Sequence, residues 1–133
     1  MSKEMDRRKY PRLYKSFKVQ IKKLEFPLKS QKLLETKCLN ISAGGIFLKT
    51  YEPFKVDDVV QVIIYIIGLG KFHKSYFKKF EALTDQKISG IGKVVRVNKL
   101  GEEFEIGIKF VDVYEDDWKA LYEFIRAELD KNS

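Results

Sequence analysis

The chain has 133 residues, a length that suits one domain and is too short for two ordinary ones. Its 44% hydrophobic content argues against disorder except at the ends, and its single cysteine excludes an internal disulfide. The net charge is +7, and residues 1–24 carry all of this excess, with nine Lys or Arg against two acidic residues. A basic segment before a neutral body indicates an anionic partner, although solvated tails are also commonly basic.

Residues 1–13 are polar and charged, and Pro11 prevents a regular helix through that point. We therefore expect a flexible basic arm over 1–13 and a single domain over 14–133. Alternating and β-branched apolar residues then predict six strands, over about 17–22, 34–41, 46–48, 59–67, 89–98 and 104–111. Short strands of this spacing indicate a closed or nearly closed antiparallel barrel, an all-β fold.

The segment 68–86 is longer than a hairpin needs. Apolar residues at helical spacing, surrounded by lysines, predict a short basic amphipathic helix over 69–83. Such a helix would cover an edge or opening of the barrel, or it would offer a docking surface to a protein partner or to anionic lipid.

The C-terminal part changes its period. Apolar residues from Tyr114 to Leu129 recur at steps of three and four, as in an amphipathic helix. We expect this helix to pack on the barrel and close one of its ends, with Trp118 as a core anchor.

The first candidate motif is Arg8-Lys9-Tyr10-Pro11-Arg12, which places two arginines four positions apart in a non-helical segment. In an extended chain both side chains point to the same side, so both guanidinium groups can face one ligand. A guanidinium group matches phosphate oxygens and the O6/N7 edge of guanine equally well. This spacing alone is weak evidence, because it occurs by chance in many basic tails.

The second motif, Asn40-Ile41-Ser42-Ala43-Gly44-Gly45, ends the second predicted strand. Asn40 and Ser42 would point outward while Ile41 points into the core. The asparagine can bond a base edge, and the serine hydroxyl can donate to a phosphate oxygen. Gly44 and Gly45 allow positive φ and leave no side chain over the site. Taken alone, the motif also fits an ordinary tight turn.

Together, the two motifs resemble the two-part signature of the PilZ family. The late strands at Gly92–Val97 and Ile106–Phe110 and the helix containing Trp118 also sit where that family has them. The resemblance covers about residues 7–129. It implies a six-stranded antiparallel barrel that binds the bacterial second messenger cyclic di-GMP (c-di-GMP) on its outer surface.

The resemblance also implies roles for individual residues. Arg8 and Arg12 would grip guanine edges and phosphates, Asn40 would reach a guanine, and Ser42 a phosphate. The residues expected at the ligand are Arg7, Arg8, Arg12, Asn40, Ser42, Gly44 and Gly45. The protein would act as a receptor without cofactor, metal or catalytic residues, and relay the signal to a protein of the flagellar, pilus or exopolysaccharide machinery.

Two other functions stay open. A small basic barrel could bind single-stranded nucleic acid, but the basic residues concentrate in one arm instead of a long groove. A PilZ-like domain could also serve as an adaptor that no longer binds ligand. Catalysis is not expected, because the only histidine, His73, lies far in the sequence from Cys38, and no catalytic motif is present. Without a signal peptide or membrane span, we expect a cytoplasmic protein.

Overall fold

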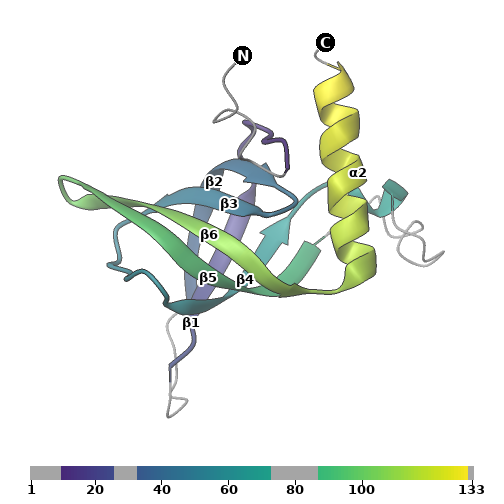
Figure 1. Ribbon diagram of the computed structural model, residues 1–133. Helices are drawn as coiled ribbons and strands as arrows, with labels where there is room; N and C mark the ends of the chain where they lie inside the picture. Colours follow the sequence, from purple (N-terminus) through teal and green to yellow (C-terminus); the bar gives the residue numbers. More distant parts are fainter. Residues whose placement is uncertain (1–9, 26–32, 73–86, 132–133) are drawn as a thin grey trace, which may run out of the picture.

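Six strands close into an antiparallel barrel in the order β1-β2-β3-β6-β5-β4 (Figure 1). The computed structural model describes residues 10–25, 33–72 and 87–131. The strands are β1 (Lys18–Lys23), β2 (Leu33–Ser42), β3 (Gly45–Thr50), β4 (Val59–Tyr65), β5 (Lys87–Leu100) and β6 (Glu103–Val113). The prediction of a six-stranded antiparallel barrel is confirmed, and the observed strand ends differ from the predicted ones by at most two residues.

The core of the barrel comes from the alternation that the sequence shows. In β1 the side chains of Val19 and Ile21 are fully buried, while Lys18, the first residue of the strand, is exposed. Strand β4 repeats the pattern with Val60, Val62 and Ile64. Since successive side chains of a strand point to opposite faces, this alternation removes one apolar face of each strand from water.

Three strands carry a bulge: β2, β5 and β6, where Val111 has no partner on β5. In β2 the pairing with β3 shifts between Cys38 and Asn40, and in β5 the pairing with β6 shifts between Val94 and Arg96. A bulge inserts one unpaired residue and changes the direction in which the following side chains point. The bulges in β2 and β5 therefore affect which residues reach the outer surface.

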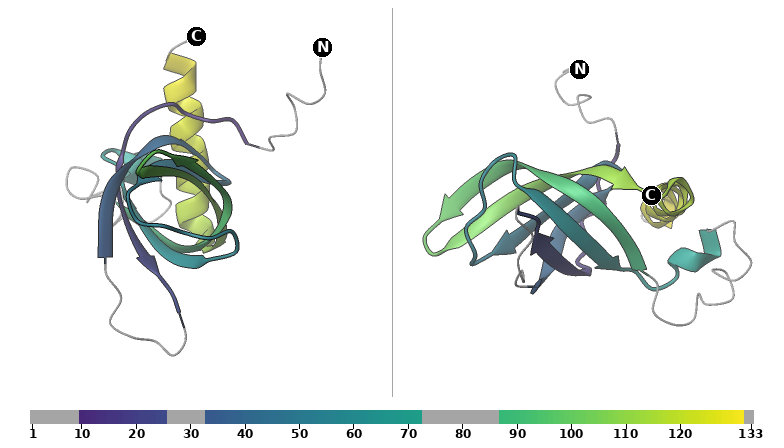
Figure 2. Two further views of the ribbon diagram at one scale, coloured as in Figure 1. Left: turned by 90° about the vertical axis from the view of Figure 1, so that its left-hand side faces the viewer. Right: turned by 90° about the horizontal axis from the view of Figure 1, so that it is seen from below.

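Helix α2 (Glu115–Lys131) closes one end of the barrel, as predicted from its apolar stripe. Figure 2 (left) looks along the barrel and shows α2 crossing behind it. The helix buries Ala120, Leu121, Phe124 and Ile125 within the same core cluster as the strands. None of the helices in the described ranges is long and apolar enough to span a membrane.

The helix predicted over 69–83 is only partly described. Residues Leu69–Phe72 form a 3-10 helix, η2, instead of an α-helix, and residues 73–86 lie outside the described part. Leu69 is buried, and the ring of Phe72 meets that of Phe124 edge-on at 6.2 Å. The described part of this segment therefore packs against α2.

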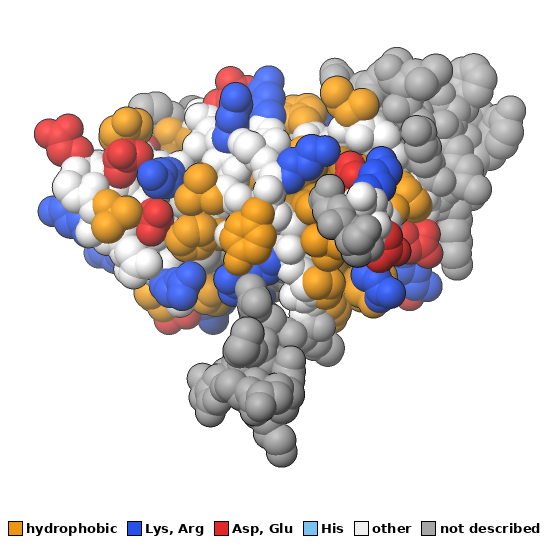
Figure 3. All heavy atoms as spheres, turned by 90° about the horizontal axis from the view of Figure 1, so that it is seen from above, with side chains coloured by type: hydrophobic (Ala, Val, Ile, Leu, Met, Phe, Trp, Pro, Cys, Tyr) orange, Lys and Arg blue, Asp and Glu red, His pale blue; other side chains and the backbone are white. Residues whose placement is uncertain are grey.

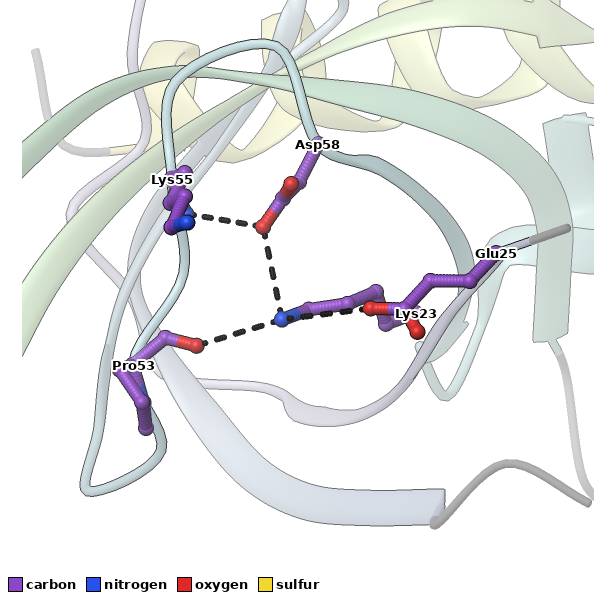
Figure 4. Close-up of polar contacts among 5 residues, drawn as sticks. All are labelled: Lys23, Glu25, Pro53, Lys55 and Asp58. Carbon is purple, nitrogen blue, oxygen red and sulfur yellow. Dashed lines mark hydrogen bonds and ion pairs between the residues drawn. The ribbon is translucent and has the colours of Figure 1, made fainter.

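The loop between β3 and β4 is tied to the end of β1 through Lys23 (Figure 4). The Nζ atom of Lys23 lies 3.6 Å from a carboxylate oxygen of Asp58 and donates to the carbonyl of Pro53 at 3.5 Å. The same loop bonds to β5, because Asp57 N donates to the Val94 carbonyl at 2.7 Å and Val94 N donates to that of Asp58 at 2.9 Å. These bonds hold β5 at the residue where its bulge begins.

Candidate functional site

The chain before β1 runs alongside the end of β2. Strand β1 pairs with β2 only as far as Lys37, which leaves the following residues of β2 without that neighbour. Leu13 takes the vacant place: its N–H donates to the carbonyl of Ile41 at 2.7 Å, and the N–H of Ile41 donates back at 3.0 Å. The Leu13 side chain is 5% exposed, so it anchors this part of the chain in the core.

This anchoring sets the positions of the two neighbours of Leu13. Because the pairing is antiparallel, Arg12 lies beside Ser42 and Tyr14 lies beside Asn40. Since side chains alternate along an extended chain, Arg12 and Tyr14 point outward where Leu13 points inward. The segment Tyr10–Tyr14 is called the arm below.

Between the arm and the barrel lies an open groove of about 720 Å3, called the arm groove below. Its lining includes all of the predicted site residues that the structure describes, namely Arg12, Asn40, Ser42, Gly44 and Gly45. Arg7 and Arg8 lie outside the described residues. The two sequence motifs, which are far apart in the chain, therefore meet at one surface.

Hydrogen bonds within the turn hold the second motif in shape. The N–H of Gly44 donates to Oγ of Ser42 at 3.1 Å, and that hydroxyl lies 3.5 Å from the Gly45 carbonyl, a long contact for a hydrogen bond. Asn40 is 8% exposed, and its side-chain amide has no hydrogen-bond partner among the described residues. The turn therefore has both a weakly held hydroxyl and an amide available to a ligand.

The positive φ expected at the two glycines of this turn is not observed. Positive φ occurs among the described glycines only at Gly68 and Gly101, not at Gly44 or Gly45. Close approach explains Gly45, since a Cβ atom there would lie 2.0 Å from the carbonyl oxygen of Ile108 on β6. At Gly44 a Cβ would lie 3.0 Å from Cδ2 of Tyr10, so this glycine makes room for the arm.

Three residues of the opposite wall were missed by the sequence reasoning: Phe47, Arg96 and Lys109. Strand pairing puts them there, because Lys109 is opposite Gly45, and Phe47 and Arg96 are both opposite Gly107. No pattern within one segment of the sequence reveals which residues of different strands lie side by side. A usable signal was the glycine of Ile106-Gly107-Ile108, since a glycine inside a strand often marks a close approach.

The arm groove carries unbalanced positive charge. It contains Arg12, Arg96 and Lys109 and no Asp or Glu. None of these three cations has an acidic partner within the described ranges, whereas Lys15, Lys23 and others are paired. Figure 3 shows the molecule from above the view of Figure 1, on the side where β2 lies. On this face the acidic side chains lie mostly toward the two ends of the molecule. Such a surface favours an anionic ligand.

The arm also contacts helix α2. The ring of Tyr10 meets Trp118 edge-on at 5.6 Å, and Trp118 stacks on Tyr122 at 5.7 Å. The indole N–H of Trp118 donates to the carbonyl of Ala43 at 2.8 Å, inside the second motif. Trp118 is thus half-buried and joins the turn to the helix, instead of being the core anchor expected from the sequence.

A second contact to α2 lies further along the chain. Nζ of Lys15 is 3.3 Å from a carboxylate oxygen of Glu128. Burial raises the pKa of Glu128, but hydrogen bonds and charge from Lys15 and Lys131 together lower it by more, so the pKa lies below its ordinary value. The carboxylate therefore stays charged and can hold Lys15 near neutral pH.

The described residues offer no obvious catalytic or metal-binding group. No cluster of His, Cys, Asp or Glu in these ranges could hold a metal ion. Cys38 is fully buried, and this burial raises the pKa of its thiol. A buried thiol with a raised pKa is a poor nucleophile, because the reactive form is the thiolate.

Comparison with known proteins identifies the family. The family model of the PilZ domain matches residues 6–127, nearly the whole chain. This chain belongs to the PilZ domain family. The sequence matched none of the curated proteins with which it was compared.

Solved structures share the fold at low sequence identity. The Bacillus subtilis inhibitor of motility MotI/DgrA superposes with a TM-score of 0.70 and 22% identity, over 96% of this chain and 54% of that one. The MrkH–c-di-GMP complex of K. pneumonia gives 0.63 and 15%, over 96% and 56%. The PilZ domain of YcgR from Escherichia coli with c-di-GMP gives 0.57 and 13%, over 95% and 96%. The chain thus spans about half the length of MotI/DgrA and MrkH.

Proposed function

We propose that this chain is a non-enzymatic receptor for c-di-GMP and that the ligand binds in the arm groove. The observation that carries the proposal is the position of Arg12 beside Ser42, in a groove whose charged side chains are all basic. A dianionic dinucleotide with guanine bases matches this combination of charge and hydrogen-bonding groups. The MrkH and YcgR structures with the same fold contain c-di-GMP, which supports the choice of ligand.

Each described residue of the two motifs has a suitable role. Arg12 can bind a guanine O6/N7 edge or a phosphate with two parallel hydrogen bonds. The free amide of Asn40 can both donate to and accept from a base edge, and the hydroxyl of Ser42 can turn from the Gly45 carbonyl to a phosphate. Gly45 contributes only backbone to the groove lining, because β6 occupies the place that its side chain would take.

Arg7 and Arg8 belong to the same proposal. In extended chain a residue advances about 3.3 Å, so Arg8 is within roughly 13 Å of Arg12 along the chain. That reach is enough for its guanidinium group to contact a dinucleotide already held by Arg12. We infer that ligand binding draws the N-terminal segment onto the groove.

The arm offers a route from the ligand to a partner protein. Tyr10 lines the arm groove and also contacts Trp118, so a ligand that moves the arm changes the surroundings of α2. We propose that α2 and the segment 68–86 present the resulting change to a cytoplasmic protein of the flagellar, pilus or exopolysaccharide machinery. Residues 73–86 of that segment lie outside the described part.

Trp118 allows this coupling to be measured. It is the only tryptophan of the chain, and it contacts Tyr10 and the carbonyl of Ala43. We expect c-di-GMP to change the tryptophan emission saturably, with the midpoint that calorimetry gives. Constant emission during a titration that calorimetry shows to be saturated would contradict the coupling between the arm groove and α2.

Isothermal titration with c-di-GMP tests the proposed function, with a single-stranded oligonucleotide as the competing ligand. We expect saturable binding of c-di-GMP that weakens only modestly as salt rises. Binding of an oligonucleotide would fall steeply, because the logarithm of the affinity changes by about −0.7 per neutralised phosphate for each decade of salt. Preferential binding of the oligonucleotide would favour a nucleic-acid-binding barrel, and binding of neither would favour a pure adaptor.

A further inference from the structure

The wall of the arm groove opposite the arm is built by the bulge in β5. Val94 is opposite Ile108 and Arg96 is opposite Gly107, so Val95 is the inserted residue. Val94 is fully buried, whereas Val95 and Arg96 are both exposed and both line the groove. Without the inserted residue, the alternation of the strand would point Arg96 to the same side as Val94, into the core.

Arg96 lies over the ring of Phe47, with its guanidinium carbon 5.4 Å from the ring centroid. The two residues are not on neighbouring strands, since β6 runs between β3 and β5. They meet because the residue between them is Gly107, to which both are paired. A Cβ atom at Gly107 would already contact both side chains, at 3.9 Å from Phe47 and 3.7 Å from Arg96. A larger side chain there would separate them.

This arrangement leaves Arg96 suited to a ligand. The guanidinium group of an arginine is planar, and an aromatic ring on one side restricts its orientation. Arg96 has no acidic partner among the described residues, and its side chain is part of the groove lining. A planar cation held in this way offers a flat face on which a base can stack, as arginine planes do in nucleic-acid recognition.

We propose that Arg96, held flat by Phe47, is a stacking platform for one guanine of the dinucleotide. The ligand would then be gripped from both walls of the groove, by Arg12 on the arm and by Arg96 on β5. This inference rests on the proposed function, and it assigns a binding role to a residue outside both sequence motifs. The proposal is specifically that a guanine stacks on the planar guanidinium group, in addition to being attracted by its positive charge.

The experiment is calorimetric titration of c-di-GMP into the full chain and four variants. Arg96→Ala removes plane and charge, and Arg96→Lys keeps the charge but removes the plane. Arg12→Ala tests the proposed function itself. Lys99→Ala is the matched control, because it removes one positive charge from an exposed position of β5 that does not line the groove.

We expect Arg96→Ala to weaken binding roughly 5- to 100-fold, the range that loss of one base–side-chain stack produces. Arg96→Lys should recover little of this loss, and Lys99→Ala should change affinity less than about two-fold because surface charges act weakly at this distance. Arg96 is exposed, so the variants should melt at the wild-type temperature. If they do not, Phe47→Leu provides an independent test, and it should weaken binding by loosening Arg96.

The outcomes separate the two ideas. If Arg12→Ala weakens binding but Arg96→Ala binds as the wild type does, the stacking role of Arg96 is wrong and the proposed function stands. If Arg96→Lys binds as the wild type does, charge alone accounts for Arg96 and stacking is wrong. If the wild-type chain does not bind c-di-GMP, both the proposed function and the platform fall.

Discussion

Replacing Arg12 by alanine is expected to weaken c-di-GMP binding roughly ten- to a hundred-fold, because hydrogen bonds to charged groups contribute about 1.5–3 kcal/mol each. The side chain points into the arm groove beside Ser42 and has no acidic partner among the described residues. Its loss therefore removes a ligand contact without breaking an ion pair of the described fold. The melting temperature should stay close to that of the wild type.

Calorimetry and thermal denaturation of the same preparations test this expectation. Lys37→Ala is a suitable control, since it removes one positive charge from an exposed position of β2 outside the groove. Arg8→Ala should behave like Arg12→Ala if the N-terminal segment reaches the ligand. Unchanged affinity in both arginine variants would show that the first motif does not bind c-di-GMP.

Replacing Gly45 by alanine is expected to have the largest effect on stability. The new Cβ atom would lie 2.0 Å from the carbonyl oxygen of Ile108 and 3.2 Å from Cα of Lys109, both of them backbone atoms of β6. Strands β3 and β6 must then separate where β3 begins. Overpacking of this kind typically destabilises a protein by 1–3 kcal/mol, and we expect about 3 kcal/mol here because no side chain can move aside.

Gly44→Ala is the matched control for this prediction. Its Cβ atom would meet the ring of Tyr10, which is a movable side chain, at 3.0 Å. We expect a destabilisation below about 1 kcal/mol, since small surface changes have small effects. Urea denaturation followed by circular dichroism measures both variants. Equal stability of Gly44→Ala and Gly45→Ala would mean that close packing of β3 on β6 does not explain the glycine.

Most of the fold could be predicted because its signal is local. The alternation of Val19 and Ile21 with lysines identifies β1, and the apolar stripe from Tyr114 to Leu129 identifies α2. The type of helix in the segment 69–83 was harder to predict, because helical spacing does not distinguish an α-helix from the 3-10 helix at Leu69–Phe72.

The candidate site was predicted only in part. Arg12, Asn40 and Ser42 could be found because each lies in a contiguous motif. Arg96 could not, since it reaches the groove through the β5 bulge and the pairing of β5 with β6. The positive φ expected at Gly45 is not observed, and the close approach of β6 that explains this glycine depends on tertiary pairing that a local pattern does not contain.

In the proposed complex, the arm and the end of β2 bind one and the same dinucleotide. Titration of c-di-GMP into the 15N-labelled chain, followed by amide chemical shifts, tests it most directly. We expect shift changes to gather at the arm, at Asn40–Phe47, and at Val95, Arg96 and Lys109, while the hairpin tip around Gly101 stays unchanged. Shift changes confined to another face, or at only one of the two motifs, would contradict it.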